Sequence, residues 1–400
     1  MRPEGQVRRC RDPGLRREDQ AGPDRRTAQA RAGWQVTQGL VLDAPVAEDW
    51  RWFDAAPLDA IAATPRGSAP DVAHLWLDLA GPRLLFVDGA LVADASTPGP
   101  LDISAAPIMT RANPYSEAAC ASAKAGYVLY LKAQAALDGP IQVIHATTGG
   151  VAHLSNKIVM MADSVASLVE THVGPGWSNA NLWVELAEGA RLMRAVRILK
   201  DDGAHTDYVS AQIGKAASFA STALVTGCRT ARIEAQMILT GEGAYGEAGG
   251  ALLTRDSEKV DSATVADHAM PEGTSRQIWR AVAADTSTAS IASRAEVRRD
   301  AQKTDGEQSL RGLLLKRTAT VNLKPELEIF ADDVKCAHGA TVGELDARAL
   351  FYLESRGIPE AQAKALLTRA FVADAIDRIG DEAVREAFAA DADAWLGAAL

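Results

Sequence analysis

The sequence has few aromatic residues and no long hydrophobic run. Aromatic side chains make up 5% of the 400 residues, although 47% are hydrophobic and 32 are glycine. We therefore expect a core built from small side chains. The longest uncharged apolar candidate, residues 125–131, ends at Lys132, far short of the roughly 18 residues that a membrane-spanning helix needs. The arginines near the start precede no apolar segment, so we also expect no secretory signal.

Cysteine and positive charge are also scarce. The four cysteines lie more than a hundred residues apart, which excludes the spacings of zinc ribbons and small disulfide scaffolds. They are Cys10, Cys120, Cys228 and Cys336. A formal net charge of -10 argues against general binding to nucleic acid or to an anionic membrane. A protein of the reducing cytoplasm is the expectation that fits both properties.

The common nucleotide and hydrolase motifs are missing. The sequence contains no GxxxxGK[ST], GxSxG or HExxH pattern, so any ATP hydrolysis would belong to a partner. Residues 241–246 match GxGxxG, but no helix-forming segment follows them. We interpret those glycines as turn residues and expect no dinucleotide site.

Composition divides the chain into four segments. Residues 1–32 are rich in arginine and proline with almost no apolar surface, which predicts a disordered, dispensable tail. Residues 33–138 read as an N-terminal mixed domain containing helix and strand. Residues 139–341 read as a β core, and residues 342–400 as a C-terminal helical domain.

The β core carries a long-range repeat. Hydrophobic and polar residues alternate along 231–239 and 321–329, as in strands with one solvated face. Turn-like units recur at intervals of 25, 26 and 27 residues. They are residues 162–165, 187–190, 213–216 and 240–243. This spacing predicts a mainly β protein with a parallel β-helix core, and the alternative is a β-sandwich with short turns.

The flanks show local patterns of hairpin and helix. Residues 83–92 predict two strands joined by an Asp-Gly turn. The alanine-rich segment 116–137 is compatible with a helix. After Gly343, apolar stripes with helical spacing predict a helix around Leu345 to Leu353, a second after Pro359, and a last one from Asp381 to about Leu396.

Two groups of potential metal ligands have weak spacing. The first combines acidic residues with a histidine: Asp201, Asp202, His205 and Asp207. Because Gly203 lies among them, we favour a solvated turn over a metal site. The second group is three histidines near strand ends: His145, His153 and His172. Each is interpreted separately as a hydrogen-bonded structural histidine.

One further pair has more promising spacing. Cys336 and His338 are two residues apart at the end of the last predicted strand, so both point to the same side of an extended chain. Lys335 would help to lower the pKa of the thiol. Two ligands cannot close a tetrahedral site, so a metal there needs ligands from another chain or a labile cluster. A buried structural cysteine is the alternative.

The residues around this pair resemble a known family. The segment 324–343, KPELEIFADDVKCAHGATVG, and the segment 350–358, LFYLESRGI, are similar to the signature of SufD scaffolds of the Suf iron–sulfur cluster assembly machinery. Supporting matches are 301–308, 313–315, 267–268 and the Glu-Asp-Trp block at 48–50. The related SufB proteins typically have Glu-His-Glu-Ala-Thr where this chain has CAHGAT. The resemblance spans about residues 45–380.

The resemblance implies a fold, partners and a cargo. The family has a right-handed parallel β-helix between an N-terminal mixed α/β region and a C-terminal helical domain. Its members pair with SufB through the last β-helix strands, and the C-terminal helices dock the ATPase SufC. Carried over to this sequence, Cys336 and His338 fall on a pair that binds a transient iron ion or iron–sulfur cluster near the SufB interface. Such a chain binds no nucleotide itself.

The resemblance does not extend to the start of the chain. The family usually has a helix and a Leu-Pro-x-Arg-type segment before the Glu-Asp-Trp block, and residues 1–44 lack both. An upstream or out-of-frame start would produce such an arginine-rich stretch.

Two functions of different classes are compatible with these patterns. The first is a non-catalytic scaffold that assembles iron–sulfur clusters with SufB and SufC and passes them on. The second is a stand-alone β-helix enzyme acting on polysaccharide. The second would need carboxylates and aromatic platforms in a groove, so the low aromatic content favours the scaffold.

Overall fold

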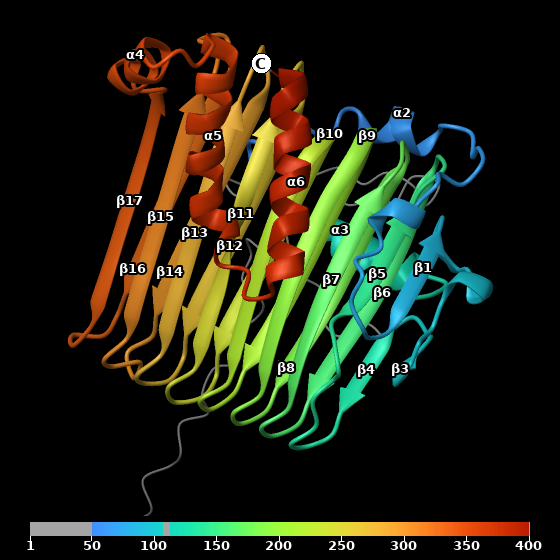
Figure 1. The fold of residues 1–400 in the computed structure, drawn as a ribbon. Helices are drawn as coiled ribbons and strands as arrows, with labels where there is room; N and C mark the ends of the chain where they lie inside the picture. Colours follow the sequence, from blue (N-terminus) through green and yellow to red (C-terminus); the bar gives the residue numbers. More distant parts are fainter. Residues whose placement is uncertain (1–49, 107–112, 400) are drawn as a thin grey trace, which may run out of the picture.

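The computed structural model describes residues 50–106 and 113–399, and shows a flattened parallel β-solenoid (Figure 1). Strands that are neighbours in space come from successive coils, and every pairing between coils is parallel. A β-sandwich would be antiparallel. The predicted parallel β-helix core is therefore confirmed.

The strands form two facing arrays, here called the first and second sheets. The first sheet contains β1 (Arg83–Val87), β5 (Ile141–Ala146), β7 (Val165–Val173), the opening halves of β9 (Arg191–Ile213) and β10 (Ser218–Leu239), β11 (Tyr245–Thr254), β13 (Thr274–Ala283), β15 (Asp305–Leu314) and β17 (Lys335–Glu344). The second sheet contains β4 (Val128–Leu131), β6 (Val151–Met160), β8 (Trp177–Leu186), the closing halves of β9 and β10, β12 (Lys259–His268), β14 (Thr288–Val297) and β16 (Thr320–Ile329).

The predicted turn units stack on one another along one edge of the solenoid. The amide of Asp163 donates to the carbonyl of Glu188 in the next coil, and that of Gly189 donates to Lys215 one coil further on. Asp163 has a φ of 57°. At Gly241, a Cβ atom would lie 2.0 Å from the amide nitrogen of Lys215 in the preceding turn. Gly241 therefore serves this close turn stacking, and Gly243 takes a φ of 68° in the same turn, as the sequence predicted; Gly246 instead lies in β11.

The space between the sheets is filled mainly by small and medium side chains. Ala166, Leu192 and Phe219 lie in register on consecutive first-sheet strands and are buried. Buried alanines, among them Ala211, Ala244 and Ala266, occupy much of the rest of this core. The expected core of small side chains is confirmed.

Two C-terminal helices, α5 (Glu360–Ile376) and α6 (Glu382–Ala399), cover the outer face of the first sheet (Figure 1). A third, α4 (Ala347–Ser355), lies beyond the end of β17 and packs against α5. All three are close to the predicted spans. Val372, Phe388 and Trp395 pack against Leu224 and Val282 of the sheet. Arg197 donates two hydrogen bonds to the Asp391 carboxylate, at 2.6 and 2.9 Å, which anchors α6 to β9.

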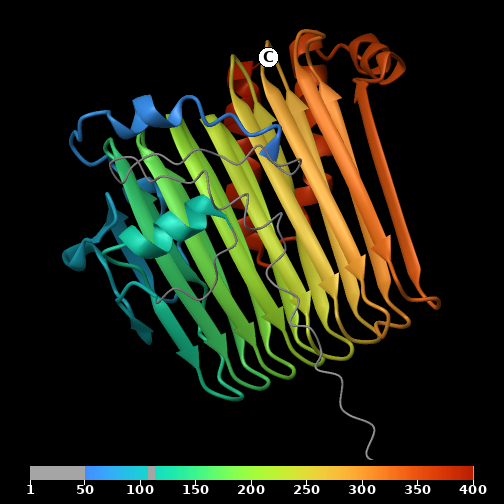
Figure 2. The ribbon, with the colours of Figure 1, turned by 180° about the vertical axis from the view of Figure 1, so that it is seen from behind.

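The region before residue 139 contributes strands to the solenoid and a helix over the second sheet. The predicted hairpin forms between β1 and β2 (Ala90–Leu91), with positive φ angles at Asp88 and Gly89. The prediction of helix over 116–137 is only partly right. Helix α3 (Pro114–Ser122) is capped by Asn113, but β4 follows because its β-branched and aromatic residues pair with β6 (Figure 2). The other short elements are α2 (Leu58–Ala62), η2 (Ala73–Leu75), η3 (Ala93–Ala95) and β3 (Leu101–Asp102).

Two further sequence predictions concern the N-terminal tail and membrane-spanning segments. The tail predicted over residues 1–32 lies outside the described residues. No helix in the described part of the chain combines the length and apolarity needed to span a bilayer.

Candidate metal-binding sites

The solenoid ends in an uncovered coil made of β16 and β17. Within the described residues, β17 pairs only with β15, and β16 only with β14. Most of β17 is exposed, and Ile329 and Phe330, at the turn between the two strands, are 40% and 60% exposed. The outer edges of both strands therefore present backbone groups that can extend each sheet.

The predicted pair lies on this last coil. Cys336 pairs in register with Gly306 and His338 with Gln308, so both side chains lie on the face of β17 that continues the inner face of β15. Cys336 is half-buried and His338 is exposed. A Cβ atom at Gly306 would lie 3.3 Å from the Cys336 sulfur, so the glycine leaves room for the thiol. The two potential ligands thus lie on the inner face of the last coil, at the open end of the solenoid.

The electrostatics of Cys336 differ from the sequence-based expectation. Partial burial raises the pKa of its thiol, helped by the charge of Asp305 and opposed by a backbone hydrogen bond at Gly306. Lys335 points to the opposite face of the strand and does not lower the pKa. The idea that Lys335 activates the thiol is wrong, so deprotonation would need the ion itself or a partner.

The described residues do not complete a site around Cys336 and His338. Across residues 50–106 and 113–399, only one group of three potential ligands has its donor atoms mutually close, and that group lies elsewhere. Among these residues, the pair therefore supplies half of a four-coordinate site.

The complete group lies in the solenoid interior and consists of His145, Glu170 and His172. Their potential ligand atoms all lie within 4.8 Å of one another. The rings of His145 and His172 stack with their centroids 4.5 Å apart, and the His205 ring lies 4.4 Å from that of His172. All three histidines and Glu170 are at most 2% exposed. We call these four residues the interior cluster.

Hydrogen bonds hold the carboxylate of this cluster. Arg194 donates to Glu170 at 2.7 Å and to Asp207 at 2.8 Å, and the Tyr127 hydroxyl donates to Glu170 at 3.0 Å. The Arg194 charge lowers the pKa of Glu170 to about 2 despite desolvation. Glu170 is therefore ionised inside the protein at neutral pH.

The histidines, by contrast, lack hydrogen-bond partners. Both ring nitrogens of His145, His172 and His205 are buried without one. Desolvation lowers the pKa of His172 and His205 well below the usual range, and nearby Lys200 and Arg194 lower it further. These two imidazoles are neutral. The interpretation of His145 and His172 as hydrogen-bonded structural residues is therefore wrong.

Sequence reasoning missed the interior cluster although one signal was available. His145 and His172 are 27 residues apart and pair in register on β5 and β7, which is one coil of the repeat. Applying the 25–27-residue spacing to the histidines would have brought these two together. His205 reaches them from the second sheet, across the interior, and no repeat predicts that contact.

The acidic group around Asp202 is split by the fold. Asp202 occupies an exposed turn with a φ of 55°. His205 and Asp207 instead point inward from β9 and are buried. The prediction of one solvated turn is right for Asp202 and wrong for the other two residues, because inward-facing positions of a strand resume after the turn.

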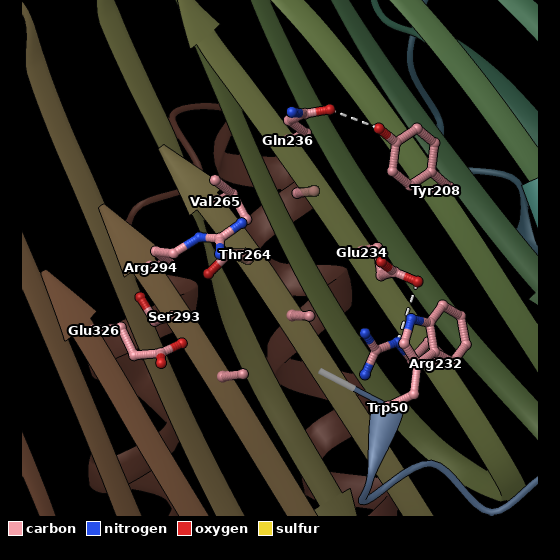
Figure 3. Close-up of a pocket in the computed structure, with 13 residues that line it drawn as sticks. Trp50, Tyr208, Arg232, Glu234, Gln236, Thr264, Val265, Ser293, Arg294 and Glu326 are labelled. Carbon is pink, nitrogen blue, oxygen red and sulfur yellow. Dashed lines mark hydrogen bonds and ion pairs between the residues drawn. The ribbon is translucent and has the colours of Figure 1, made fainter. Parts of the chain in front are cut away.

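A groove of about 220 Å³ lies on the outer face of the second sheet (Figure 3). Trp50 covers the Arg232 guanidinium at 4.2 Å, and Arg232 bonds to Glu234 at 3.1 Å. Glu326 lies 3.1 Å from Lys324. Both carboxylates of the groove are thus paired with cations, which is unlike the acid and nucleophile pair of a glycosidase.

Comparisons with known proteins connect this geometry to one family. A family model described as "SUF system FeS cluster assembly, SufBD core domain" matches residues 141–371. The chain is 29% identical over 261 residues to the iron-sulfur cluster assembly protein SufD of Escherichia coli strain K12, covering 62% of this chain and 61% of that protein. It is 30% identical over 243 residues to the iron-sulfur cluster assembly SufBD family protein Mb1497 of Mycobacterium bovis, covering 58% and 61%.

A plant relative matches over a shorter segment. Protein ABCI7, chloroplastic, of Arabidopsis thaliana is 39% identical over 128 residues, covering 32% of this chain and 26% of that protein. The chain thus spans about three fifths of the bacterial relatives and about a quarter of the plant one.

Proposed function

The chain belongs to the SufBD family of iron–sulfur cluster assembly proteins, and we propose that it acts as the SufD-type subunit of a Suf assembly complex. In this role it is a non-catalytic cytoplasmic scaffold. It supports iron acquisition, cluster assembly and transfer together with SufB and the ATPase SufC. The observation that carries the proposal is the uncovered last coil with Cys336 and His338 on its inner face.

The open end supports pairing with SufB. A solenoid buries its core only where another coil or a cap covers it, and nothing in the described part of this chain covers β16 and β17. A SufB subunit with a matching end coil would extend both sheets by antiparallel strand pairing, because two solenoids of the same hand that meet through their last coils run in opposite directions. Val342, which is 46% exposed here, would then be buried.

The same contact would complete the ligand set. Cys336 and His338 supply one thiolate and one imidazole, and the facing strand of SufB would supply the rest. Iron or a nascent cluster is the cargo of this shared site, so a weak half-site in each subunit suits its release. A reducing compartment keeps such a thiol available.

The C-terminal helices are the surface for the ATPase. Phe351 and Tyr352 on α4 are 71% and 56% exposed, an unusual exposure for large side chains. Arg378 on this side of the molecule is not available for docking, because its guanidinium is paired with Glu247 of β11 at 2.7 Å. Arg369 is likewise held by Asp393 at 2.5 Å. We therefore place the docking surface on α4.

Single substitutions in the co-expressed complex test the proposal. His338→Ala should reduce the iron and sulfide content of the complex measured anaerobically, while the subunits still co-purify. Cys336→Ser should have an equal or milder effect if SufB thiols hold most of the cluster. Neither change opens a large cavity, so folding should be retained.

The control is His74→Ala, which removes an exposed histidine of η2 far from the open end. His145 is unsuitable as a control because it belongs to the interior cluster. Normal loading of the His338 variant would refute the ligand role. Dissociation of the complex would instead identify His338 as an interface contact.

A further inference from the structure

The interior cluster carries unsatisfied polar groups that a folded core rarely keeps. Six imidazole nitrogens, those of His145, His172 and His205, are buried with no hydrogen-bond partner. Elsewhere in the same core, His268 bonds to Ser275 at 2.8 Å. Buried polar atoms almost always have a hydrogen-bond partner. The six unpartnered nitrogens therefore indicate that a group bound between the three rings is missing.

The geometry of the cluster suits a metal ion. Zinc lies about 2.0–2.2 Å from nitrogen and oxygen ligands, so ligands of a tetrahedral site are about 3.4 Å apart. The potential ligand atoms of His145, Glu170 and His172 are within 4.8 Å of one another, and the imidazole nitrogen Nε2 of His145 lies 3.7 Å from Glu170 Oε1. Small side-chain rotations therefore close the remaining difference. The His205 ring is tilted by 58° against that of His172 with the centroids 4.4 Å apart, but it lies outside the group of three, so it would have to turn toward the ion to supply a fourth ligand.

The surroundings orient and prepare these ligands. Arg194 and Tyr127 hydrogen-bond Glu170, as the outer partners of metal-bound carboxylates do. All three imidazoles are at most 2% exposed, so water does not compete for their nitrogens.

We propose that His145, Glu170 and His172, completed by His205, bind a divalent transition-metal ion inside the solenoid. The site links β5 and β7 of the first sheet to β9 in the second sheet, so the ion cross-links adjacent coils. It is chemically distinct from the open end because its ligands are imidazole and carboxylate, and it needs no second chain. Ligands of this type bind Zn²⁺, Fe²⁺ and Co²⁺.

Lys200 gives the proposal an electrostatic signature. Its ammonium is buried, donates to Thr147 at 2.8 Å, and contributes to lowering the pKa of both His172 and His205. The carboxylates of Glu170 and Asp207 balance Arg194 and Lys200 in formal charge. A divalent ion is therefore repelled by Lys200, and removing that charge should tighten binding.

The experiment uses the full chain carrying Cys336→Ser and His338→Ala, so that the open end cannot contribute. The protein is unfolded, freed of metal with a chelator, and refolded with Zn²⁺ or Co²⁺. We expect about one zinc ion per chain and a Co²⁺ absorption spectrum typical of a four-coordinate site with nitrogen and oxygen ligands. Loss of iron from the assembly complex would bear on the proposed function, whereas this measurement is independent of it.

Three variants sharpen the result. His172→Leu and His145→Leu replace a ring by an apolar side chain of similar size, and each should reduce the bound zinc to none while the circular dichroism stays native. Lys200→Met should tighten zinc binding at least about tenfold. His268→Gln, in a different coil, should retain the parent's zinc content.

Two results would overturn the proposal. The first is a refolded parent chain that holds no zinc or cobalt. The second is equal metal content in the parent and in whichever leucine variant folds.

Discussion

The interior cluster and the open end both contain histidines, but in opposite surroundings. The histidines of the interior cluster are at most 2% exposed, and a network of ion pairs surrounds them. His338 is exposed on a strand with one unpaired edge. The first region brings three potential ligands together within the described part of one chain, whereas at the second region those residues supply only Cys336 and His338 and no covering coil.

This difference shows that the location of a charged or metal-binding side chain decides whether its partners must come from the same chain. A charge inside the solenoid must be matched by this chain, because water cannot stabilise it. A ligand at the end can remain unmatched until a partner arrives. We therefore expect changes in the interior to appear as altered stability, and changes at the end to appear as lost binding.

The largest effect is expected from Arg194→Met. Arg194 is buried and hydrogen-bonds both Glu170 and Asp207, so its loss leaves two buried carboxylates without their cation. The free energy of unfolding should fall by about 3–5 kcal/mol. Urea titration followed by circular dichroism measures the change. The control is Arg317→Met near the open end, whose pair with Glu344 is exposed and should contribute less than about 1 kcal/mol. Equal losses in the two variants would contradict the comparison.

A second effect is acid sensitivity that originates in the interior. In the metal-free chain, burial lowers the pKa of His172 and His205, so below pH 6.5 these histidines bind protons in the unfolded chain but not in the folded one. Stability is therefore lost as the pH falls, by about 1.4 kcal/mol per pH unit for each histidine once the unfolded form is protonated. From pH 6.5 to 5, these two histidines together should cost about 3 kcal/mol.

Urea midpoints measured at several pH values test this slope. His172→Leu should flatten it by about one proton. Glu170 acts in a lower window, because its folded pKa of about 2 keeps its contribution until the pH falls below 4.5. A midpoint that is independent of pH between 6.5 and 5 would show that the histidines accept protons inside the fold.

The third prediction concerns the free edge of β17. The Lys335 amide donates to Thr304, so alternation along a parallel strand directs the amide of Ala340 away from β15. Ala340→Pro should therefore change the free energy of unfolding by less than about 1 kcal/mol but abolish co-purification with SufB. Thr341→Pro is the matched change, because that amide faces β15 and its loss should destabilise the chain itself. Retained SufB capture by the Ala340 variant would exclude strand pairing at this edge.

The smallest change in stability is expected from Phe351→Ala on α4. Phe351 is 71% exposed, so the free energy of unfolding should change by less than about 0.5 kcal/mol. Affinity for SufC, measured by calorimetry, should fall about tenfold or more if the ring is a central contact. Tyr130→Ala provides the control, since Tyr130 is 58% exposed on β4 at the other end of the solenoid. Unchanged SufC affinity would move the docking surface away from α4.

Much of the fold could be predicted because it depends on local and periodic signals. Alternation along 231–239 identified strand, the 25–27-residue spacing identified the coils, and the Asp-Gly turn identified the β1–β2 hairpin. The helix over 116–137 was over-extended because alanine content says little about a strand that is stabilised by pairing with β6.

The pair at the open end and the interior cluster differ in how well they could be predicted from the sequence. The common face of Cys336 and His338 was predicted because i and i+2 on one strand point to the same side, which is a local property, and their role as ligands stays a prediction. Lys335 was given the wrong role because burial, not the neighbouring charge, dominates the pKa of Cys336. The interior cluster escaped because its members face one another from different coils and from both sheets.

The order of residues thus specified the repeating coil, the helical C-terminal segment and the cysteine–histidine pair, since each follows from spacing along a single strand or helix. Tertiary structure alone decided which charges are buried together and which end of the solenoid remains uncovered. Burial and contact across the two sheets involve residues that are one coil or more apart in the sequence. The interactions between these residues contribute their full free energy only after water has been excluded from between them.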